Sequence, residues 1–181
     1  MEQVFETEFG GRKLIVKTGL LAGQANGSVV VQYGETVVLA TAVMSEQDKD
    51  VDFFPLTVEY EERFYAAGKI KGSRFIKRET RPPDEAILAG RLIDRSLRPL
   101  FPEGMKREVQ IINTVLSTDQ ENDPDIVALY ASTLAVAISD IPFNGPIAGL
   151  RIGLIPSSDP EKAPEFCLNP TYAARAKSLL I

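Results

Sequence analysis

The chain has 181 residues, with 25 Asp and Glu against 20 Lys and Arg, no histidine and one cysteine. The absence of histidine excludes a Ser-His-Asp triad, a Cys-His pair and a histidine-ligated zinc site within the chain. The single cysteine, Cys167, excludes an internal disulfide and favours a reducing cytoplasm. The composition is otherwise that of a globular protein of about one domain, without an apolar run of the roughly 20 residues that a membrane span needs.

Four strands are predicted in the N-terminal part of the chain, arranged as two hairpins. The first hairpin covers residues 3–17 around a Gly-Gly turn, and the second covers residues 28–43 around Gly34-Glu35. The second pair is apolar almost throughout, which predicts burial on both faces. A further strand is expected within residues 53–64, where Pro55 indicates an irregularity or a sheet edge.

Helices and strands alternate in the rest of the chain. A helix is predicted over residues 84–98, because a proline pair precedes it and a proline stops it. A second helix, residues 126–140, follows Asp123 as N-cap and Pro124 at the first helical position, and its small apolar side chains predict burial between layers. Strands are expected at residues 109–117, 147–155 and 166–169, with a short helix over residues 171–178. This order indicates an α/β (α+β) fold, a mixed, largely antiparallel sheet with packed helices.

Basic charge is concentrated in residues 69–98. This stretch of 30 residues holds nine of the 20 basic residues and only four of the 25 acids, so its net charge is +5 while the rest of the chain carries −10. Such a concentration within an acidic chain is typical of a binding site for a polyanion. The alternative is a charge run that is merely solvated.

The first part of the basic stretch, residues 69–81, has six basic residues and one acid, Glu79. Phe75 and Ile76 lie among the cations. This pattern suits single-stranded nucleic acid, because the charges follow the phosphates while an aromatic ring stacks on a base. The alternative is a solvated basic loop with Phe75 packed into the core.

The second part is the predicted helix, in which Arg91, Arg95 and Arg98 fall on one stripe at positions i, i+4 and i+7. Arginines near a helix C-terminus complement the helix dipole, and Asp94 can pair with Arg98 or Arg91. The dipole does not account for Arg91, so the stripe favours an anion such as phosphate or a nucleic-acid backbone. The opposite face is expected to be the core side: Ala86, Ala89, Leu92, Ile93 and Leu97.

Two other patterns are interpreted structurally. Asp119, Asp123 and Asp125 are of the type that binds magnesium, but Asp123 is better explained as a helix cap. The spaced glycines of residues 145–153 precede no helix, so they do not predict a phosphate-binding loop.

Three segments resemble the first core domain of the bacterial polynucleotide phosphorylase family: GKIKGSRFIKRE, RLIDRSLRPLFPEG and NDPDIVALYASTLAVAISDIPFNGPIAGLRIG. The likeness covers most of the chain, from the first hairpin through the segment LNPTYAARAKS. It implies an RNase PH-like fold. It also implies processive 3′-to-5′ phosphorolysis of RNA in mRNA degradation, which releases nucleoside diphosphates, with RNA synthesis as the reverse reaction.

In that family a loop of two phenylalanines and two arginines guides RNA, and its positions here are Phe75, Ile76, Lys77 and Arg78. Ile76 replaces the second aromatic residue and Lys77 the first arginine, so the positive charge is kept but the second stacking ring is missing. Arg91 and Arg95 match the family's active-site arginines. The remaining positions expected to bind RNA are on the same basic stretch: Arg74, Arg81 and Arg98.

The family's enzymes are much longer than this chain. The resemblance places phosphate-binding serines and magnesium-binding aspartates in a second RNase PH-like domain, followed by a helical linker and two C-terminal RNA-binding domains. Residues 1–181 are therefore expected to be the first domain, incomplete at its apolar C-terminus and inactive alone. No metal site is expected on this chain, and Mg²⁺ and inorganic phosphate would serve the full-length enzyme.

The resemblance also implies partners. They are single-stranded RNA, two further copies in a trimeric ring with RNA threading a central pore, and an RNA-degradation assembly. The alternative reading is a non-catalytic RNA-binding ring subunit of an exosome-like assembly.

Overall fold

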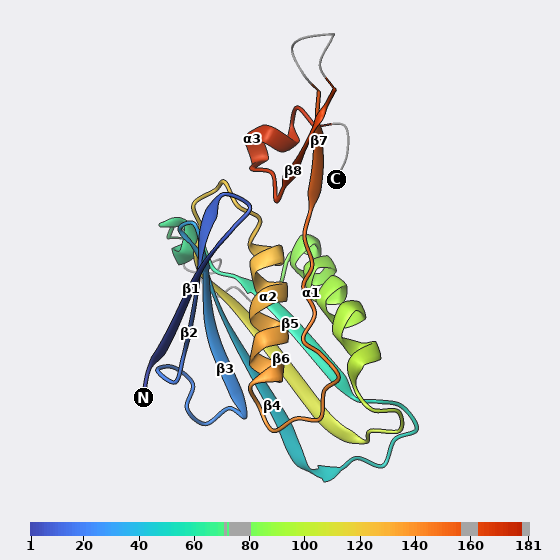
Figure 1. Cartoon of the computed structure of the whole chain (residues 1–181). Coiled ribbons are helices and arrows are strands. Elements are labelled where there is room, and N and C mark those ends of the chain that lie inside the picture. The colour runs from blue at the N-terminus through green and yellow to red at the C-terminus, as the bar shows by residue number, and fades with distance from the viewer. Residues whose placement is uncertain (71, 73–80, 157–162, 179–181) are drawn as a thin grey trace.

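A computed structural model describes residues 1–70, 72, 81–156 and 163–178 (Figure 1). The strands are β1 (Gln3–Phe9), β2 (Arg12–Thr18), β3 (Gly27–Tyr33), β4 (Thr36–Asp48), β5 (Leu56–Glu62), β6 (Arg107–Ser117), β7 (Ile152–Ile155) and β8 (Glu165–Leu168). The helices are α1 (Asp84–Leu97), α2 (Pro124–Ala137) and α3 (Tyr172–Arg175), with short 3₁₀ turns at Phe64–Ala67 and Arg98–Leu100. No helix in the described part of the chain has the length and apolar character to cross a membrane.

The main sheet has six strands in the order β1-β2-β3-β4-β6-β5. Its neighbours are antiparallel except for β5 and β6, which are parallel, with Val58 opposite Ile111. The prediction of a mixed, largely antiparallel sheet is therefore confirmed. Strand β5 lies at an edge and begins directly after Pro55, as the proline indicated.

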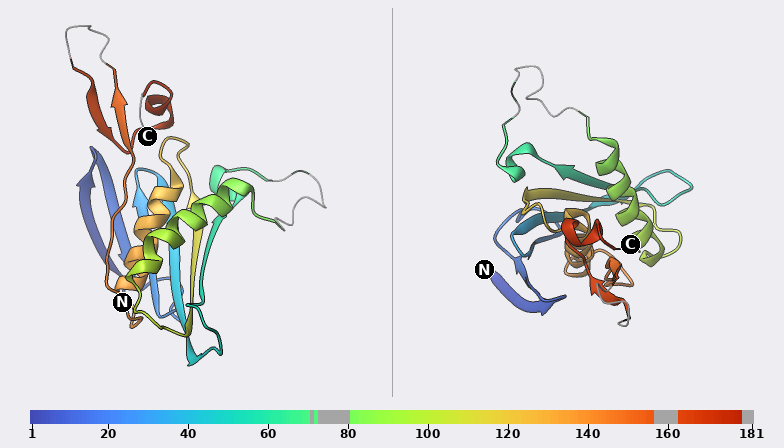
Figure 2. Two further views of the ribbon diagram at one scale, coloured as in Figure 1. Left: turned by 90° about the vertical axis from the view of Figure 1, so that its right-hand side faces the viewer. Right: turned by 90° about the horizontal axis from the view of Figure 1, so that it is seen from above.

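Both predicted hairpins are present, but the expectation of burial on both faces was wrong. Strand β3 alternates between buried and half-buried residues along its length, and β4 does so over residues 36–42, after which it has no buried residue. The reason is visible in Figures 1 and 2: helices α1 and α2 pack against the same face of the sheet, and no helix of the described residues forms a layer on the other face. Both faces of these two strands are apolar in sequence, but helices pack against only one of them in the described structure.

Helix α2 forms the centre of the core. Ten of its 14 residues are buried, and it packs against β3, β4 and β6. It was expected from its small apolar side chains, although the helix ends at Ala137 rather than residue 140. Asp123 occupies the N-cap position, yet its side chain makes no capping hydrogen bond, so the predicted role for this carboxylate was wrong.

The predicted strand at residues 147–155 is only partly present. Residues 147–151 run alongside α2, where the Ile147 N–H donates to Thr133 Oγ1 at 3.0 Å. Gly149 lies so close to α2 that a Cβ added at this residue would be 2.4 Å from a methyl carbon of Leu129. Residues 147–151 therefore contact side chains of α2 instead of pairing with a neighbouring strand. Strand β7 begins after them and pairs with β8 in a separate two-stranded sheet, which lies beside α3 and beyond one end of the main sheet (Figure 1).

Candidate nucleic-acid interface

Helix α1 carries the described part of the basic stretch. Prolines 82 and 83 precede it, and Asp84 and Glu85 lie in its first turn, where negative charge complements the helix dipole. Its buried residues are Ala86, Ala89, Gly90, Ile93 and Leu97. Leu92 was predicted to belong to this face but is 45% exposed, because it lies a quarter turn away from the stripe that contacts β5.

Gly90 brings α1 close to the edge strand of the sheet. A Cβ added at this position would lie 3.2 Å from the backbone carbonyl oxygen of Val58 in β5. Along this contact the helix and the strand border a groove of about 510 Å³, whose lining includes Arg91, Asp94 and Arg98. The helix therefore covers an otherwise open strand edge and presents arginines beside it.

Arg98 does not belong to an open anion-binding stripe. Its Nε and Nη2 atoms donate to the two carboxylate oxygens of Asp94 at 3.0 and 2.7 Å. Its Nη1 and Nη2 atoms also donate to the backbone carbonyls of Phe54 and Leu56 at 2.9 and 3.1 Å. Because the guanidinium is committed to internal partners, the predicted stripe of three arginines is reduced to two.

Arg91 and Arg95 are exposed and have no hydrogen-bond or ion-pair partner among the residues that the structure describes. We call these two side chains the α1 face. Most of the other described arginines are committed to protein partners: Arg12, Arg63, Arg98, Arg107, Arg151 and Arg175. Two guanidiniums one helical turn apart repel each other unless an anion lies between them, so the α1 face is suited to a phosphate group.

The other predicted RNA-binding positions are only partly described. Arg81 is exposed just before α1 and, like the α1 face, has no partner among the described residues. It extends the unpaired positive charge beyond the helix. The positions proposed to guide RNA lie outside the described residues: Arg74, Phe75, Ile76, Lys77 and Arg78.

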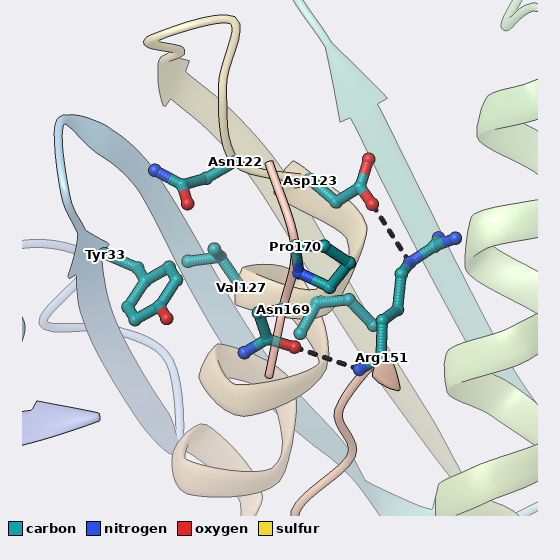
Figure 3. A pocket seen from close by; sticks show the side chains of 8 residues that line it. Tyr33, Asn122, Asp123, Val127, Arg151, Asn169 and Pro170 are labelled. Atoms are coloured by element: carbon teal, nitrogen blue, oxygen red, sulfur yellow. Dashed lines mark hydrogen bonds and ion pairs between the residues drawn. The ribbon is translucent and has the colours of Figure 1, made fainter. Parts of the chain in front are cut away.

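A second arginine group, which the sequence did not predict, lies at the N-terminal end of α2. Figure 3 shows one of its members, Arg151, beside Asp123. Arg151 Nε lies 3.0 Å from Asp123 Oδ2 as an ion pair without the geometry of a hydrogen bond. Arg175 Nη1 donates to the same oxygen at 2.6 Å, and Arg151 also pairs with Asp125. This α2 network consists of Arg12, Arg151 and Arg175 with their partners Asn122, Asp123, Asp125 and Asn169.

The α2 network joins segments that are far apart in the sequence. Arg12, beside the first turn, donates through Nη1 to Asn122 Oδ1 and to the Asn169 carbonyl, each at 2.8 Å. Asn169 in turn accepts the Arg151 backbone N–H at 2.9 Å and donates to Tyr130. The network thus fastens the segment of β7, β8 and α3 to the main sheet. In the sequence only the aspartates around Pro124 pointed to the α2 network, because their arginine partners are brought to them by tertiary contacts.

The three aspartates considered as magnesium ligands all have structural partners. Burial alone would raise the pKa of Asp119, but hydrogen bonds from the backbone N–H groups of Asn122 and Glu121 and from side chains hold that pKa below its ordinary value. Asp123 and Asp125 pair with arginines. Among the described residues no group of three acidic, histidine or cysteine side chains is arranged to hold a metal ion.

Two tyrosines near this end of the sheet, the buried Tyr60 and the partly exposed Tyr172, act as hydrogen-bond donors rather than bases. Burial, followed by the charge of Glu62, raises the pKa of Tyr60, whose hydroxyl donates to Glu62 Oε1 at 2.7 Å. Burial and Asp123 likewise raise the pKa of Tyr172. Both phenols stay protonated at neutral pH, so the charge of this region comes from its carboxylates and arginines.

Residues 10–142 match the model of the 3′ exoribonuclease family, domain 1 (RNase PH). The chain is 53% identical to the polyribonucleotide nucleotidyltransferase of Exiguobacterium sibiricum over 98% of its own length, and 57% identical to that of Enterococcus faecalis over 94%. It spans 23% of each of these relatives.

A solved structure supports the fold alone. The structure of rice (Oryza sativa) Rrp46 superposes with a TM-score of 0.66 at 12% sequence identity, covering 98% of this chain and 72% of that one. The expectation of an RNase PH-like fold is confirmed by this likeness and by the family match.

Proposed function

This chain belongs to the 3′ exoribonuclease family, domain 1, and from that premise we propose that it works as part of a polyribonucleotide nucleotidyltransferase that degrades RNA from the 3′ end by phosphorolysis. Within such an enzyme this part supplies cations that bind the RNA backbone. The chain spans about a quarter of the length of its curated relatives.

The observation that carries the proposal is the contrast in arginine pairing. Arg91 and Arg95 are exposed, one helical turn apart, and without a partner in the described structure, although Asp94 lies beside them in the sequence. Unpaired guanidiniums at this spacing match the oxygens of a phosphate group. Arg81, which also lacks a partner among the described residues, adds a third cation before the helix.

The chemistry expected of these residues is charge stabilisation. In phosphorolysis an oxygen of inorganic phosphate attacks the terminal phosphodiester, a P–O bond forms, and the bond to the 3′ oxygen of the penultimate nucleotide breaks. The products are a nucleoside diphosphate and an RNA one nucleotide shorter, whose new 3′ hydroxyl takes up the proton. Such transfer depends on positioning and on stabilising charge at the phosphoryl oxygens, which a pair of free arginines provides without a histidine.

Cofactor and assembly belong to the same proposal. The described carboxylates do not fit a magnesium site, since Asp119, Asp123 and Asp125 are engaged by protein donors. We therefore place the Mg²⁺ site and the binding site for the phosphate co-substrate on parts of the enzyme outside this chain. A homotrimeric ring, an RNA-degradation assembly, a cytoplasmic location and a role in mRNA turnover complete the proposal.

The test is a double substitution of the α1 face, Arg91→Gln with Arg95→Gln. Binding of a fluorescent single-stranded oligoadenylate would be measured by anisotropy at several salt concentrations. We expect affinity to fall at least about tenfold, because a charge-assisted hydrogen bond contributes about 1.5–3 kcal/mol. The slope of log K against log salt should fall by about 1.4, or roughly 0.7 for each lost phosphate contact.

The matched control is Lys106→Gln with Arg107→Gln, which removes two exposed positive charges at the start of β6. We expect this variant to bind nearly as tightly as the parent chain. Equal losses in both variants would mean that only net charge matters, and no loss in the α1 variant would refute the proposed interface.

The non-catalytic alternative gains no specific support. The likeness to Rrp46 at 12% identity concerns the fold, whereas the relatives at 53–57% identity are named as nucleotidyltransferases.

A further inference from the structure

Asp94 is placed where it could neutralise the α1 face. It lies three residues after Arg91 and four residues before Arg98, and side chains at both spacings are neighbours on a helix. An ion pair with Arg91 would remove half of the free charge on which the proposed RNA contact depends. Which arginine takes this carboxylate therefore decides whether the α1 face is a binding surface.

The structure resolves the competition in favour of Arg98. Both carboxylate oxygens of Asp94 accept from the Arg98 guanidinium, at 2.7 and 3.0 Å. The order of the pair, acid before base by four residues, is the favourable orientation on a helix. A fork-to-fork pair of this kind occupies the carboxylate more fully than a single contact from Arg91 could.

Arg98 is itself fixed from a second side. Its remaining donors reach the Phe54 and Leu56 carbonyls just before and at the start of β5, and its guanidinium lies 5.7 Å from the centre of the Phe54 ring. The pair is thus anchored to the sheet edge rather than held only by two helix side chains. An anchored pair keeps Asp94 away from Arg91 without the entropy cost of ordering a free surface pair.

We propose that Arg98 is a positioning residue for RNA binding: by engaging the Asp94 carboxylate and tying it to β5, it leaves Arg91 and Arg95 uncompensated for phosphate. The inference rests on the proposed function, since it concerns the same α1 face. It assigns Arg98 no contact with RNA, in contrast to the direct RNA-binding role expected from the sequence.

The test compares Arg98→Met, Asp94→Asn and the double variant in the oligoadenylate assay. Arg98→Met frees Asp94 to pair with Arg91, so we expect the salt slope to fall by about 0.7, equivalent to one phosphate contact, with roughly tenfold weaker binding. The double variant has the parent's net charge and no Asp94 carboxylate, so its slope should return to the parent value. Asp94→Asn alone should change affinity by less than about twofold.

General charge effects are removed by a control, Arg98→Met with Glu85→Gln, which restores net charge at an exposed residue of the first turn. We expect this variant to remain as weak as Arg98→Met. If Arg98→Met with Asp94→Asn also binds RNA weakly, Arg98 either contacts RNA itself or acts only through the stability of the fold. The inference then fails.

Thermal unfolding of each variant accompanies the binding assay. Should Arg98→Met fail to fold, Arg98→Lys tests the same idea, because a lysine keeps one contact with Asp94 and should preserve the salt slope while lowering the melting temperature. A lowered slope in Arg98→Lys would overturn the inference. Arg91→Gln separates the two proposals: if it binds as the parent does, the proposed function itself fails, whatever Arg98 does.

Discussion

The α2 network and the α1 face use the same side chain for opposite purposes. In the α2 network every arginine meets a carboxylate, a carbonyl or an amide oxygen within 3.0 Å. On the α1 face Arg91 and Arg95 meet none among the described residues, and the nearest acid along the helix is taken by a third arginine. Arginines cluster in both regions, so clustering alone does not reveal their role. Arginines that pair with protein oxygens hold the fold, whereas unpaired arginines are available to a ligand.

Arg151→Met, in the α2 network, is expected to have the largest effect on stability. The substitution leaves Asp123 and Asp125 partly buried with fewer cations, and losing one partner of a buried pair costs about 3 kcal/mol. The free energy of unfolding of each variant would be measured by urea unfolding monitored by circular dichroism. The control is Lys13→Met, which breaks an exposed pair with Glu6 and should cost less than about 1 kcal/mol. Equal costs at the two sites would show that the α2 network has no special structural role.

A smaller effect is expected at Asp119, which orders the turn leading into α2. Its pKa is lowered in the folded state, so the ionised carboxylate contributes stability above the unfolded pKa, and that contribution is lost as pH falls through the folded value. At pH 7 Asp119→Asn should cost about 1–2 kcal/mol, because the remaining oxygen carries no charge and the amide nitrogen cannot accept the hydrogen bonds that Oδ2 accepts from the Glu35 N–H and the Asn122 side chain.

The measurement for Asp119 is unfolding free energy as a function of pH. The difference between the parent and Asp119→Asn should shrink below about pH 4, where aspartate becomes protonated. A difference that stays constant down to acid pH would mean that shape rather than charge holds this turn.

The smallest predicted effect has the opposite sign. Arg91→Gln removes a like-charge pair at i, i+4 with Arg95 and so should stabilise the fold by about 0.3 kcal/mol. Arg98→Gln, on the same helix, should destabilise it because Asp94 and two carbonyls lose their donor. Melting temperatures of the two variants give the comparison directly. Destabilisation by Arg91→Gln would assign Arg91 to the structural group.

Local patterns predicted most of the fold. Strand alternation, the glycine turns and the prolines flanking the helices depend on short-range geometry, so both hairpins, α1 and α2 were placed correctly. The segment before β7 was placed wrongly because its backbone partners, such as Thr133, belong to a helix elsewhere in the chain. Leu92 shows the same limit on a smaller scale, since only the position of β5 decides which side of α1 is buried.

The candidate site divides in the same way. Helical spacing placed Arg91 and Arg95 together and named Arg98 and Arg91 as alternative partners of Asp94. The choice between them depends on the carbonyls of Phe54 and Leu56, some 40 residues earlier in the chain, which no local pattern reveals. The α2 network was missed for the same reason, because Asp123 and Arg151 are brought together by the path of the chain around α2.

The strand order of the main sheet has a consequence for synthesis on the ribosome. Strand β6 lies between β4 and β5 but follows β5 in the chain, with about 55 residues separating their last positions. At translation rates of about 5–20 residues per second, β5 exists for roughly 3 to 11 seconds before its partner strand is complete. During that interval both of its edges are open to foreign strands, and the acids Glu59, Glu61 and Glu62 oppose such pairing. We therefore expect the acidic side chains of β5 to oppose aggregation of the nascent chain, in addition to forming part of the surface of the finished fold.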